Sequence, residues 1–169
     1  MLDTVKSRVN GLDLNALGEV VEGIQDDAGK AKVTFDVTTR WQGQTRSHKI
    51  VADEPCELLG SDGAANPQEL LMAAVNACMT VGYVAGAALR GITLEKLEIR
   101  TSGSLDLRGF LGLDDKVPPG YEAIDYRVTI AGNGTPEQFE EIHQTVMKTS
   151  PNYFNINRPI RMNGVLQIA

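Results

Sequence analysis

The chain has 169 residues, of which 42% are hydrophobic and 22% charged, an ordinary composition for one globular domain with its own core. The formal net charge of −6, without a concentrated cluster of Lys and Arg, argues against nucleic-acid binding. The first twenty residues lack the apolar stretch and the small-residue cleavage site of a signal peptide, so we expect a cytoplasmic protein. Two cysteines without His or Cys at ligand spacing indicate neither a disulfide framework nor a metal site.

The pattern of apolar residues predicts a surface helix and then a hairpin in the first third of the chain. Residues 13–25, DLNALGEVVEGIQ, have helical apolar spacing, with Asp13 as a cap. Residues 32–41, KVTFDVTTRW, alternate apolar and polar side chains, which is typical of a half-buried strand. The turn RWQGQTR and the segment SHKIVAD predict a returning strand. Residues 54–67, EPCELLGSDGAANP, are rich in turn formers and predict a loop.

The stretch NPQELLMAAVNACMT, residues 66–80, predicts the start of a long helix. Asn66 can cap it, Pro67 suits the first helical position, and Glu69 falls where a carboxylate can reach back to the cap. The helix should run to about Arg90, because Gly91 can adopt the left-handed conformation that closes a helix.

The uncharged run from Leu70 to Leu89 is long enough to raise the question of a membrane span. Gly82 and Gly86 form a small-xxx-small pair, which is also found in membrane helices. The run is rich in Ala and Gly rather than Leu and Ile, carries two polar residues, and stands alone in the sequence. We therefore favour a central helix that is buried by protein.

The remaining residues predict strands on either side of a second helix. Residues 92–107 have a strand alternation that slips phase once, which predicts one or two strands with a bulge. Residues 106–121 form an excursion rich in Gly and Pro, which is suited to a lid, and residues 121–132 alternate cleanly. Thr135 and its neighbours predict the cap of an amphipathic helix that ends near Pro151, and strand-like residues finish the chain. The order predicts an α+β fold, with residues 1–30 as an N-terminal helical extension and residues 31–169 as one domain.

The segment NPQELLMAAVNAC, residues 66–78, resembles the helix signature of the OsmC/Ohr family, the osmotically inducible and organic-hydroperoxide-resistance proteins. In that signature a Pro, an acidic residue and an Ala-rich run precede a reactive thiol, and Cys78 stands at the position of that thiol. The order of elements over roughly residues 32–168 also resembles the family. The resemblance implies an OsmC-like fold, with antiparallel strands around a long buried helix, in an interlocked homodimer whose interface holds the thiol. It also implies that the face with Gly82 and Gly86 packs against protein.

The resemblance implies a thiol peroxidase that reduces organic hydroperoxides or other small electrophiles, with Cys78 as the nucleophile. Family members of this kind pass through a sulfenic acid and use a dithiol reductant, typically of the lipoyl type, without a prosthetic group. The thiolate needs a nearby cation. By similarity the cation is an Arg of the first hairpin, Arg40 as first candidate and Arg46 as second. Glu69 is the candidate acid that orients this Arg. On a straight helix Glu69 would lie about 13 Å from Cys78 along the axis, so capping the helix is at least as good a role for it.

Two residues depart from the family pattern. Where family members place a resolving Cys-Pro near the end of the second helix, this chain has Ser150 before Pro151. The hydroperoxide-resistance branch of the family places its acid ten residues before the thiol, and this chain has Gln68 there, which is not a carboxylate. Cys56 is a candidate second thiol, provided that its Cα can come within about 7 Å of that of Cys78. Two other functions therefore stay open: a non-enzymatic dimer that binds a small apolar ligand, and a redox sensor that uses Cys56 and Cys78.

Overall fold

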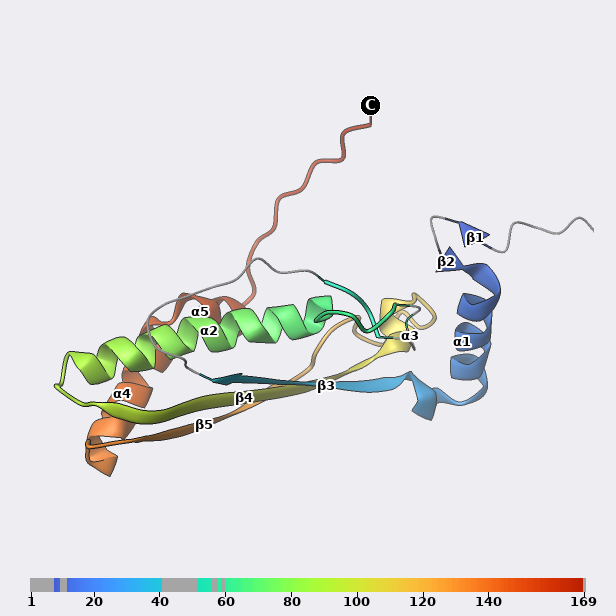
Figure 1. The fold of residues 1–169 in the computed structure, drawn as a ribbon. Helices are drawn as coiled ribbons and strands as arrows, with labels where there is room; N and C mark the ends of the chain where they lie inside the picture. The colour runs from blue at the N-terminus through green and yellow to red at the C-terminus, as the bar shows by residue number, and fades with distance from the viewer. Residues whose placement is uncertain (1–7, 10–11, 41–51, 56–57, 59, 169) are drawn as a thin grey trace, which may run out of the picture. The chain divides into compact units, whose positions relative to one another are not determined.

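A computed structural model describes residues 8–9, 12–40, 52–55, 58 and 60–168, and at residues 8–9, 12–14, 17 and 33–40 it describes the backbone only (Figure 1). Among the described strands, one sheet has the order β3 (Lys32–Arg40), β4 (Leu94–Asp106), β5 (Ile124–Gly132), and a second pairs β1 (Arg8–Val9) with β2 (Leu12–Asp13). The chain divides into two compact units, built from residues 1–38, 46–73 and 100–127 and from residues 39–45, 74–99 and 128–169. Helix α2 (Pro67–Ala88) and strands β3, β4 and β5 each have residues in both units.

The first unit begins with a short antiparallel pair and a helix. Strand β1 (Arg8–Val9) pairs with β2 (Leu12–Asp13), and α1 (Leu14–Asp26) and the 3-10 helix η1 (Ala28–Ala31) lead into β3 (Lys32–Arg40). The short helix α3 (Leu107–Phe110) follows β4 directly. The core of this unit consists of buried aliphatic residues from α1, η1, β4 and α3, with partly buried neighbours packed against them. These are Ile24, Ala31, Leu105 and Leu107, with Val20, Leu58, Leu111, Leu113 and Tyr121.

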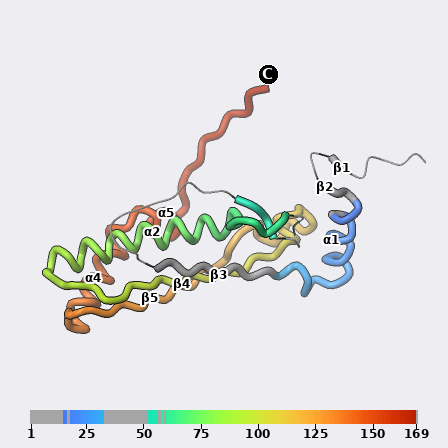
Figure 2. Tube along the Cα trace, in the orientation of Figure 1, coloured from blue at the N-terminus to red at the C-terminus, as the bar shows by residue number. Residues whose placement is uncertain are grey.

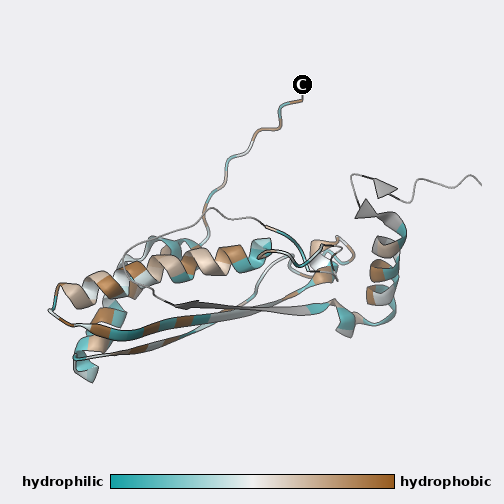
Figure 3. Ribbon diagram, in the orientation of Figure 1, coloured by the Kyte–Doolittle hydropathy of each residue, from teal (hydrophilic) through white to brown (hydrophobic). Residues whose placement is uncertain are grey.

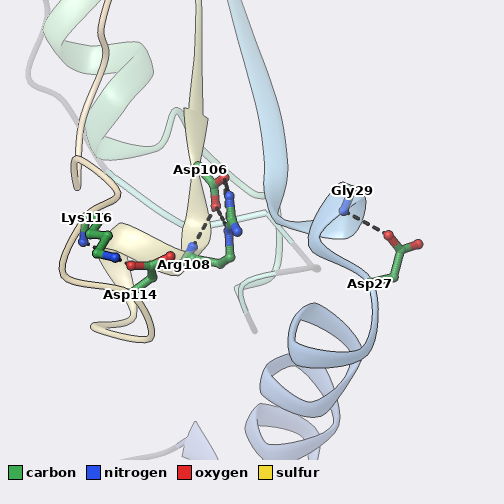
Figure 4. Close-up of polar contacts among 6 residues, drawn as sticks. All are labelled: Asp27, Gly29, Asp106, Arg108, Asp114 and Lys116. Carbon is green, nitrogen blue, oxygen red and sulfur yellow. Dashed lines mark hydrogen bonds and ion pairs between the residues drawn. The ribbon is translucent and has the colours of Figure 1, made fainter.

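Three aspartates shape the turns of the first unit in the same way (Figure 4). The carboxylates of Asp27, Asp106 and Asp114 each accept a hydrogen bond from the backbone N–H two residues later, at 2.8 to 3.0 Å. Such local bonds satisfy backbone donors that no helix or strand uses. Asp106 also pairs with the Arg108 guanidinium at 2.7 Å, and the hydrogen bonds from that side chain lower the pKa of Asp106. Residues 106–117 are therefore held as an ordered excursion, as the sequence predicts.

The second unit is built around the packing of α2 on α4 (Pro136–Thr149). Two glycines of α2 face two buried β-branched residues of α4: a Cβ at Gly82 would lie 3.0 Å from a methyl group of Val146, and one at Gly86 would lie 3.0 Å from a methyl group of Ile142. The residue numbers fall by four on one helix as they rise by four on the other, so the helices run antiparallel with i±4 rows in contact. The face with the two glycines thus packs against protein, as expected.

Local signals in the sequence account for most of the helix ends. Thr135 and Gln138 form the reciprocal capping box of α4, and Gly91 closes α2 with a positive φ of 67°. The predicted strand over residues 92–107 is β4, in which the neighbouring residues Glu95 and Lys96 are both exposed where the alternation slips. Figure 3 shows the alternating hydropathy along β4. The returning strand predicted in SHKIVAD lies almost wholly outside the described residues.

Two expectations for the C-terminal region are wrong. The chain does not pass from the second helix to a strand: after α4 ends at Thr149, a second short helix, α5, covers Pro151–Ile156. Pro151 cannot continue α4 with a backbone N–H but fits the first position of a new helix. Residues 157–168 form no strand in the single chain, although their composition is strand-like.

Tyr121 is a titratable group that the core of the first unit partly buries. Its ring packs on Gly103, where a Cβ would lie 2.8 Å from the ring, and its buried hydroxyl has no hydrogen-bond partner among the described residues. Burial, with a smaller contribution from the charge of Glu69, raises the pKa of Tyr121 to about 12. The folded state thus keeps a proton that an unfolded tyrosine releases at about pH 10.

We expect the free energy of unfolding to fall as the pH rises from about 10 to about 12, because the unfolded state binds fewer protons there. This contribution is fully present below the unfolded pKa and is lost as the pH passes the folded one. Tyr121→Phe should remove both this pH dependence of the unfolding free energy and the tyrosine ionisation that occurs at the highest pH, measured by tyrosinate absorbance. Tyr126→Phe serves as the control. If the tyrosine ionisation at the highest pH persists in Tyr121→Phe, it does not belong to Tyr121.

We also expect Gly86→Val to lower the free energy of unfolding by about 1–3 kcal/mol, because the added atoms overlap the buried Ile142 side chain. In an Ile142→Ala background the same change should cost much less, since it then fills the cavity. Urea unfolding of the four proteins measures the coupling. If the two changes are simply additive, the proposed contact does not limit the packing of the two helices.

Candidate functional site

The start of α2 is fixed by a reciprocal cap. The Asn66 Oδ1 accepts hydrogen bonds from the backbone N–H groups of Gln68 and Glu69, each at 2.9 Å. In return, a carboxylate oxygen of Glu69 accepts from the Asn66 N–H at 2.9 Å. Asn66 is buried, so these bonds satisfy groups that water does not reach. Glu69 therefore has the capping role that the sequence suggests, and Cys78 lies nine positions further along the helix.

Cys78 lies half-buried near the middle of α2, and the hydroxyl of the buried Ser150 donates a hydrogen bond to its sulfur at 3.3 Å. The same Ser150 oxygen accepts from the Tyr153 N–H at 3.4 Å as the N-cap of α5, while the Ser150 N–H bonds the last turn of α4. The Ser150 hydroxyl thus accepts from the Tyr153 N–H while it donates to the sulfur. Ser150, at the position where the family resemblance implies a resolving cysteine, therefore contacts the thiol directly.

The contact between Ser150 and Cys78 continues the packing of α2 on α4. The pairs Gly86 and Ile142, Gly82 and Val146, and Cys78 and Ser150 follow each other at intervals of four residues. Beyond them, the Asn152 amide donates to the Ala74 carbonyl at 2.9 Å, which ties α5 to α2 one turn before the thiol (Figure 2). The position of the hydroxyl on the sulfur is therefore set by backbone packing and by a second hydrogen bond.

Two further polar side chains of α2 point into the second unit. Asn76 is fully buried and its amide donates to the Ile99 carbonyl of β4 at 3.4 Å. Tyr83, 1% exposed, hydrogen-bonds through its hydroxyl to Nδ1 of His143 on α4, and the two rings are stacked with centroids 6.1 Å apart. Sequence reasoning missed this pair, because residues 60 positions apart share no local signal.

The other predicted site residues are not brought to the thiol by the described atoms. Arg40 ends β3, where only the backbone is described, and Arg46 and Cys56 lie outside the described residues. Within the described part of the chain, no three His, Cys, Asp or Glu side chains gather as a metal site would require. The roles of Arg40, Arg46 and Cys56 stay predictions.

An acidic cluster lies in the loop before α2. The Asp53 carboxylate accepts from the Ser61 hydroxyl and from the backbone N–H groups of Glu54, Ser61 and Gly63, and these bonds, the hydroxyl first, lower its pKa. Burial raises the pKa of Glu54, and the charges of Asp53 and Glu69 add to the effect. The hydrogen bonds to Asp53 therefore hold the loop together, and the carboxylates of Asp53 and Glu54 keep the surroundings of Glu69 negative.

One face of α2 is exposed and wholly apolar. It consists of residues spaced three or four apart, and we call it the outer stripe: Pro67, Leu71, Ala74, Ala77, Val81, Ala85 and Ala88. Among the described helices, α2 alone is long and apolar enough to cross a membrane, a test that the core helix of a soluble protein also passes. Cys78 borders this stripe, since it follows Ala77 directly and lies four residues after Ala74.

We expect Ser150→Cys to form a disulfide with Cys78, because the 3.3 Å contact places the two side chains on facing positions of packed helices. Thr149→Cys, one residue earlier and exposed, is the matched control and should keep both thiols. Both variants are made in a Cys56→Ser background, oxidised mildly and analysed by mass spectrometry of non-reduced peptides. Two free thiols in Ser150→Cys would show that the contact does not persist in solution.

Comparison with known proteins agrees with the geometry. The family described as OsmC-like protein matches residues 60–163. The crystal structure of an OsmC like protein from Mycoplasma pneumoniae has a TM-score of 0.50 and 18% sequence identity, and the match covers 57% of this chain and 65% of that one, which shows a shared fold. A search of curated proteins found no match. The family match spans more than half of this chain. The chain therefore belongs to the family of OsmC-like proteins and has the α+β fold that the resemblance of its helix signature predicts.

Proposed function

We propose that the chain is a cytoplasmic, thiol-dependent reductase of organic hydroperoxides or related small electrophiles, acting in oxidative-stress defence, with Cys78 as its nucleophile. The observation that carries this proposal is the placement of the thiol. Cys78 is half-buried rather than enclosed, occupies the nucleophile position of the family signature, and has a hydroxyl donor held 3.3 Å from its sulfur. A cysteine that only filled the core would not need a fixed polar partner.

The reaction requires two half-cycles. In the first, the Cys78 thiolate attacks the outer oxygen of the hydroperoxide; a sulfur–oxygen bond forms, the O–O bond breaks, and the alcohol leaves after taking a proton. In the second, one thiol of a dithiol such as a lipoyl group attacks the sulfenic sulfur and water leaves. The other thiol of the reductant then attacks the mixed disulfide, which releases the Cys78 thiolate and leaves the reductant as a cyclic disulfide. Ser150 cannot form the usual internal disulfide, so the external dithiol must reach the sulfur itself.

Arg40 or Arg46 completes the site in this proposal by bringing a positive charge to the thiolate, and Glu69 orients that Arg. The Glu69 carboxylate already accepts the Asn66 N–H through one oxygen, which leaves the other oxygen for a guanidinium. Glu69 lies about 13 Å from Cys78 along the helix, so the Arg must span the distance or come from another chain.

The second chain in this proposal is an identical copy, and the protein acts as a homodimer. The outer stripe of α2 supports it: seven apolar or small residues face water along the whole helix, and a facing helix of a second copy would cover them. Because Cys78 borders the stripe, its pocket would form at this interface. A bilayer or a nucleic acid is not proposed as a partner, given the single apolar helix and the net charge of −6.

A non-enzymatic dimer that binds a small apolar ligand is the second candidate. The Ser150 and Gln68 departures from the family pattern favour it, because serine cannot form the disulfide that resolves a sulfenic acid and Gln68 is not a carboxylate. A redox sensor that forms a disulfide between Cys56 and Cys78 is the third. The three functions differ in what happens to Cys78 when peroxide is added.

The test is the rate at which wild-type and Cys56→Ser proteins consume cumene hydroperoxide and hydrogen peroxide, followed by mass spectrometry of the cysteine peptides. We expect rapid consumption, addition of one oxygen to Cys78 in both proteins, and complete loss of the reaction in Cys78→Ser. A Cys56 to Cys78 disulfide would favour the sensor. A thiol that reacts no faster than free cysteine would overturn the reductase and favour the ligand-binding dimer.

The same assay identifies the cation. Replacing the correct Arg, by Arg40→Gln or Arg46→Gln, should slow the first half-cycle about 10²-fold, because the thiolate and the departing alkoxide lose their charge partner. Arg127→Gln, at an exposed position of β5, is the matched control and should react like the wild type. Equal rates in all three variants would exclude both candidates.

A further inference from the structure

The start of α5 contacts α2 beside the thiol at two points. The Ser150 hydroxyl donates to the Cys78 sulfur at 3.3 Å, and the Asn152 side-chain amide donates to the Ala74 carbonyl at 2.9 Å. Ala74 and Cys78 are four residues apart on α2, so the two contacts lie one helical turn from each other. Two polar side chains of α5 therefore act on the immediate surroundings of one thiol.

Asn152 occupies the acceptor that lies nearest to the thiol proton. In a helix, a side-chain hydroxyl commonly donates to the carbonyl four residues earlier, and the Thr hydroxyls that do so here at 2.8 Å are those of Thr80, Thr145 and Thr149. For the Cys78 thiol the corresponding carbonyl is that of Ala74. A carbonyl oxygen has two lone pairs; here one accepts the helical N–H of Cys78 and the other accepts the Asn152 amide. The local acceptor for the thiol proton is therefore already in use.

Ser150 presents the opposite kind of group, a donor, to the sulfur. Ser150 is 5% exposed, so water competes little for its hydroxyl, which also accepts from the Tyr153 N–H at 3.4 Å. A hydrogen bond to a charged partner is roughly twice as strong as one between neutral groups, so this contact strengthens when the sulfur becomes a thiolate. The two contacts thus act in the same direction. Ser150 stabilises the thiolate, and Asn152 withholds an acceptor from the thiol.

Other sources of positive potential contribute little at this position in the described part of the chain. Cys78 lies near the middle of α2, whereas the effect of a helix dipole falls off within the first turn. Of the ionisable side chains in the last turn of α4 and in α5, Lys148 is exposed, where water and salt screen its charge, and Tyr153 meets Ser150 through its backbone. Hydrogen bonding is therefore the means by which the described residues favour the thiolate.

We propose that the start of α5 activates Cys78, with Ser150 as a catalytic hydrogen-bond donor to the reacting sulfur and Asn152 as a positioning residue on the Ala74 carbonyl. This inference rests on the proposed role of Cys78 as a nucleophile and adds two residues to that site. In the first half-cycle the thiol has already lost its proton to water, and the sulfur electron pair forms the bond to the outer peroxide oxygen. The O–O bond then breaks and the departing alkoxide takes a proton from water, while Ser150 keeps its own.

The test is the pH dependence of the alkylation of Cys78 by iodoacetamide, followed by intact mass in the full chain with Cys56→Ser. This reagent reacts with the thiolate whether or not the protein reduces peroxides. The pH of half-maximal rate should rise by about one unit in Ser150→Ala, with a rate about tenfold lower below that pH, because a hydrogen bond to an anion is lost. Asn152→Leu should shift the profile in the same direction by less. The plateau rate at high pH should not fall, since every thiol is then ionised.

The controls separate the two hydrogen bonds from helix stability and from charge. Ser150→Thr keeps both a hydroxyl and a helix cap, so it should restore the wild-type profile. Thr149→Ala and Asn155→Leu remove an exposed hydroxyl and an exposed amide next to the two tested positions, and both should alkylate like the wild type. Lys148→Gln, which removes an exposed charge, should also leave the profile unchanged.

Wild-type profiles in both Ser150→Ala and Asn152→Leu would overturn the inference. So would a rate lowered by the same factor at every pH, which would indicate changed access to the sulfur. A shift in one variant alone retains that residue and excludes the other, and Asn152→Leu, at a partly buried position, decides if Ser150→Ala does not fold. Peroxide consumption is measured separately. A wild-type protein that shows the expected alkylation profile but consumes no hydroperoxide would exclude the reductase and leave the activation of the thiol in place.

Discussion

The structure around the thiol depends on how closely α2 and α4 approach each other. Gly82 and Gly86 have no side chains, so a methyl group of Val146 and one of Ile142 can each approach to 3.0 Å from where a Cβ would lie. The next pair at the same four-residue interval is Cys78 and Ser150. If larger residues replaced the glycines, the helices would separate and the hydroxyl would lose the sulfur. The uncharged, glycine-containing character of α2 is thus a requirement of the site as well as of the core.

The end of α4 also decides what kind of group meets the thiol. Ser150 ends one helix and begins another, and its hydroxyl accepts from Tyr153 while it donates to Cys78. A cysteine here would cap α5 poorly but could form a disulfide, whereas serine stabilises the turn and cannot. The chain therefore has a fixed hydrogen bond where the family resemblance implies an internal resolving thiol. This difference is why an external reductant with direct access to Cys78 is part of the proposed chemistry.

What the sequence predicted well is what neighbouring residues determine. The cap at Asn66 and Glu69, the capping box at Thr135 and the closing Gly91 were all predicted, because each depends on residues within four positions. The contact of Ser150 with Cys78 spans 72 residues and the pair of Tyr83 with His143 spans 60, and no local pattern indicates either. Family resemblance pointed to Cys78, but it marked Ser150 only as a position without the usual cysteine.

Residues 157–168 show a different limit, since their alternation is plain in the sequence and yet no strand forms in one chain. A strand needs a neighbour for its backbone hydrogen bonds, so the pattern specifies a face without specifying what it faces. The outer stripe of α2 presents the same situation on a helix. Both features leave apolar surface uncovered, and both adjoin the site, one beside Cys78 and the other through α5. A single chain therefore contains Cys78 and its hydrogen-bond partner, and in the proposed homodimer a second copy would cover apolar surface that one chain leaves exposed.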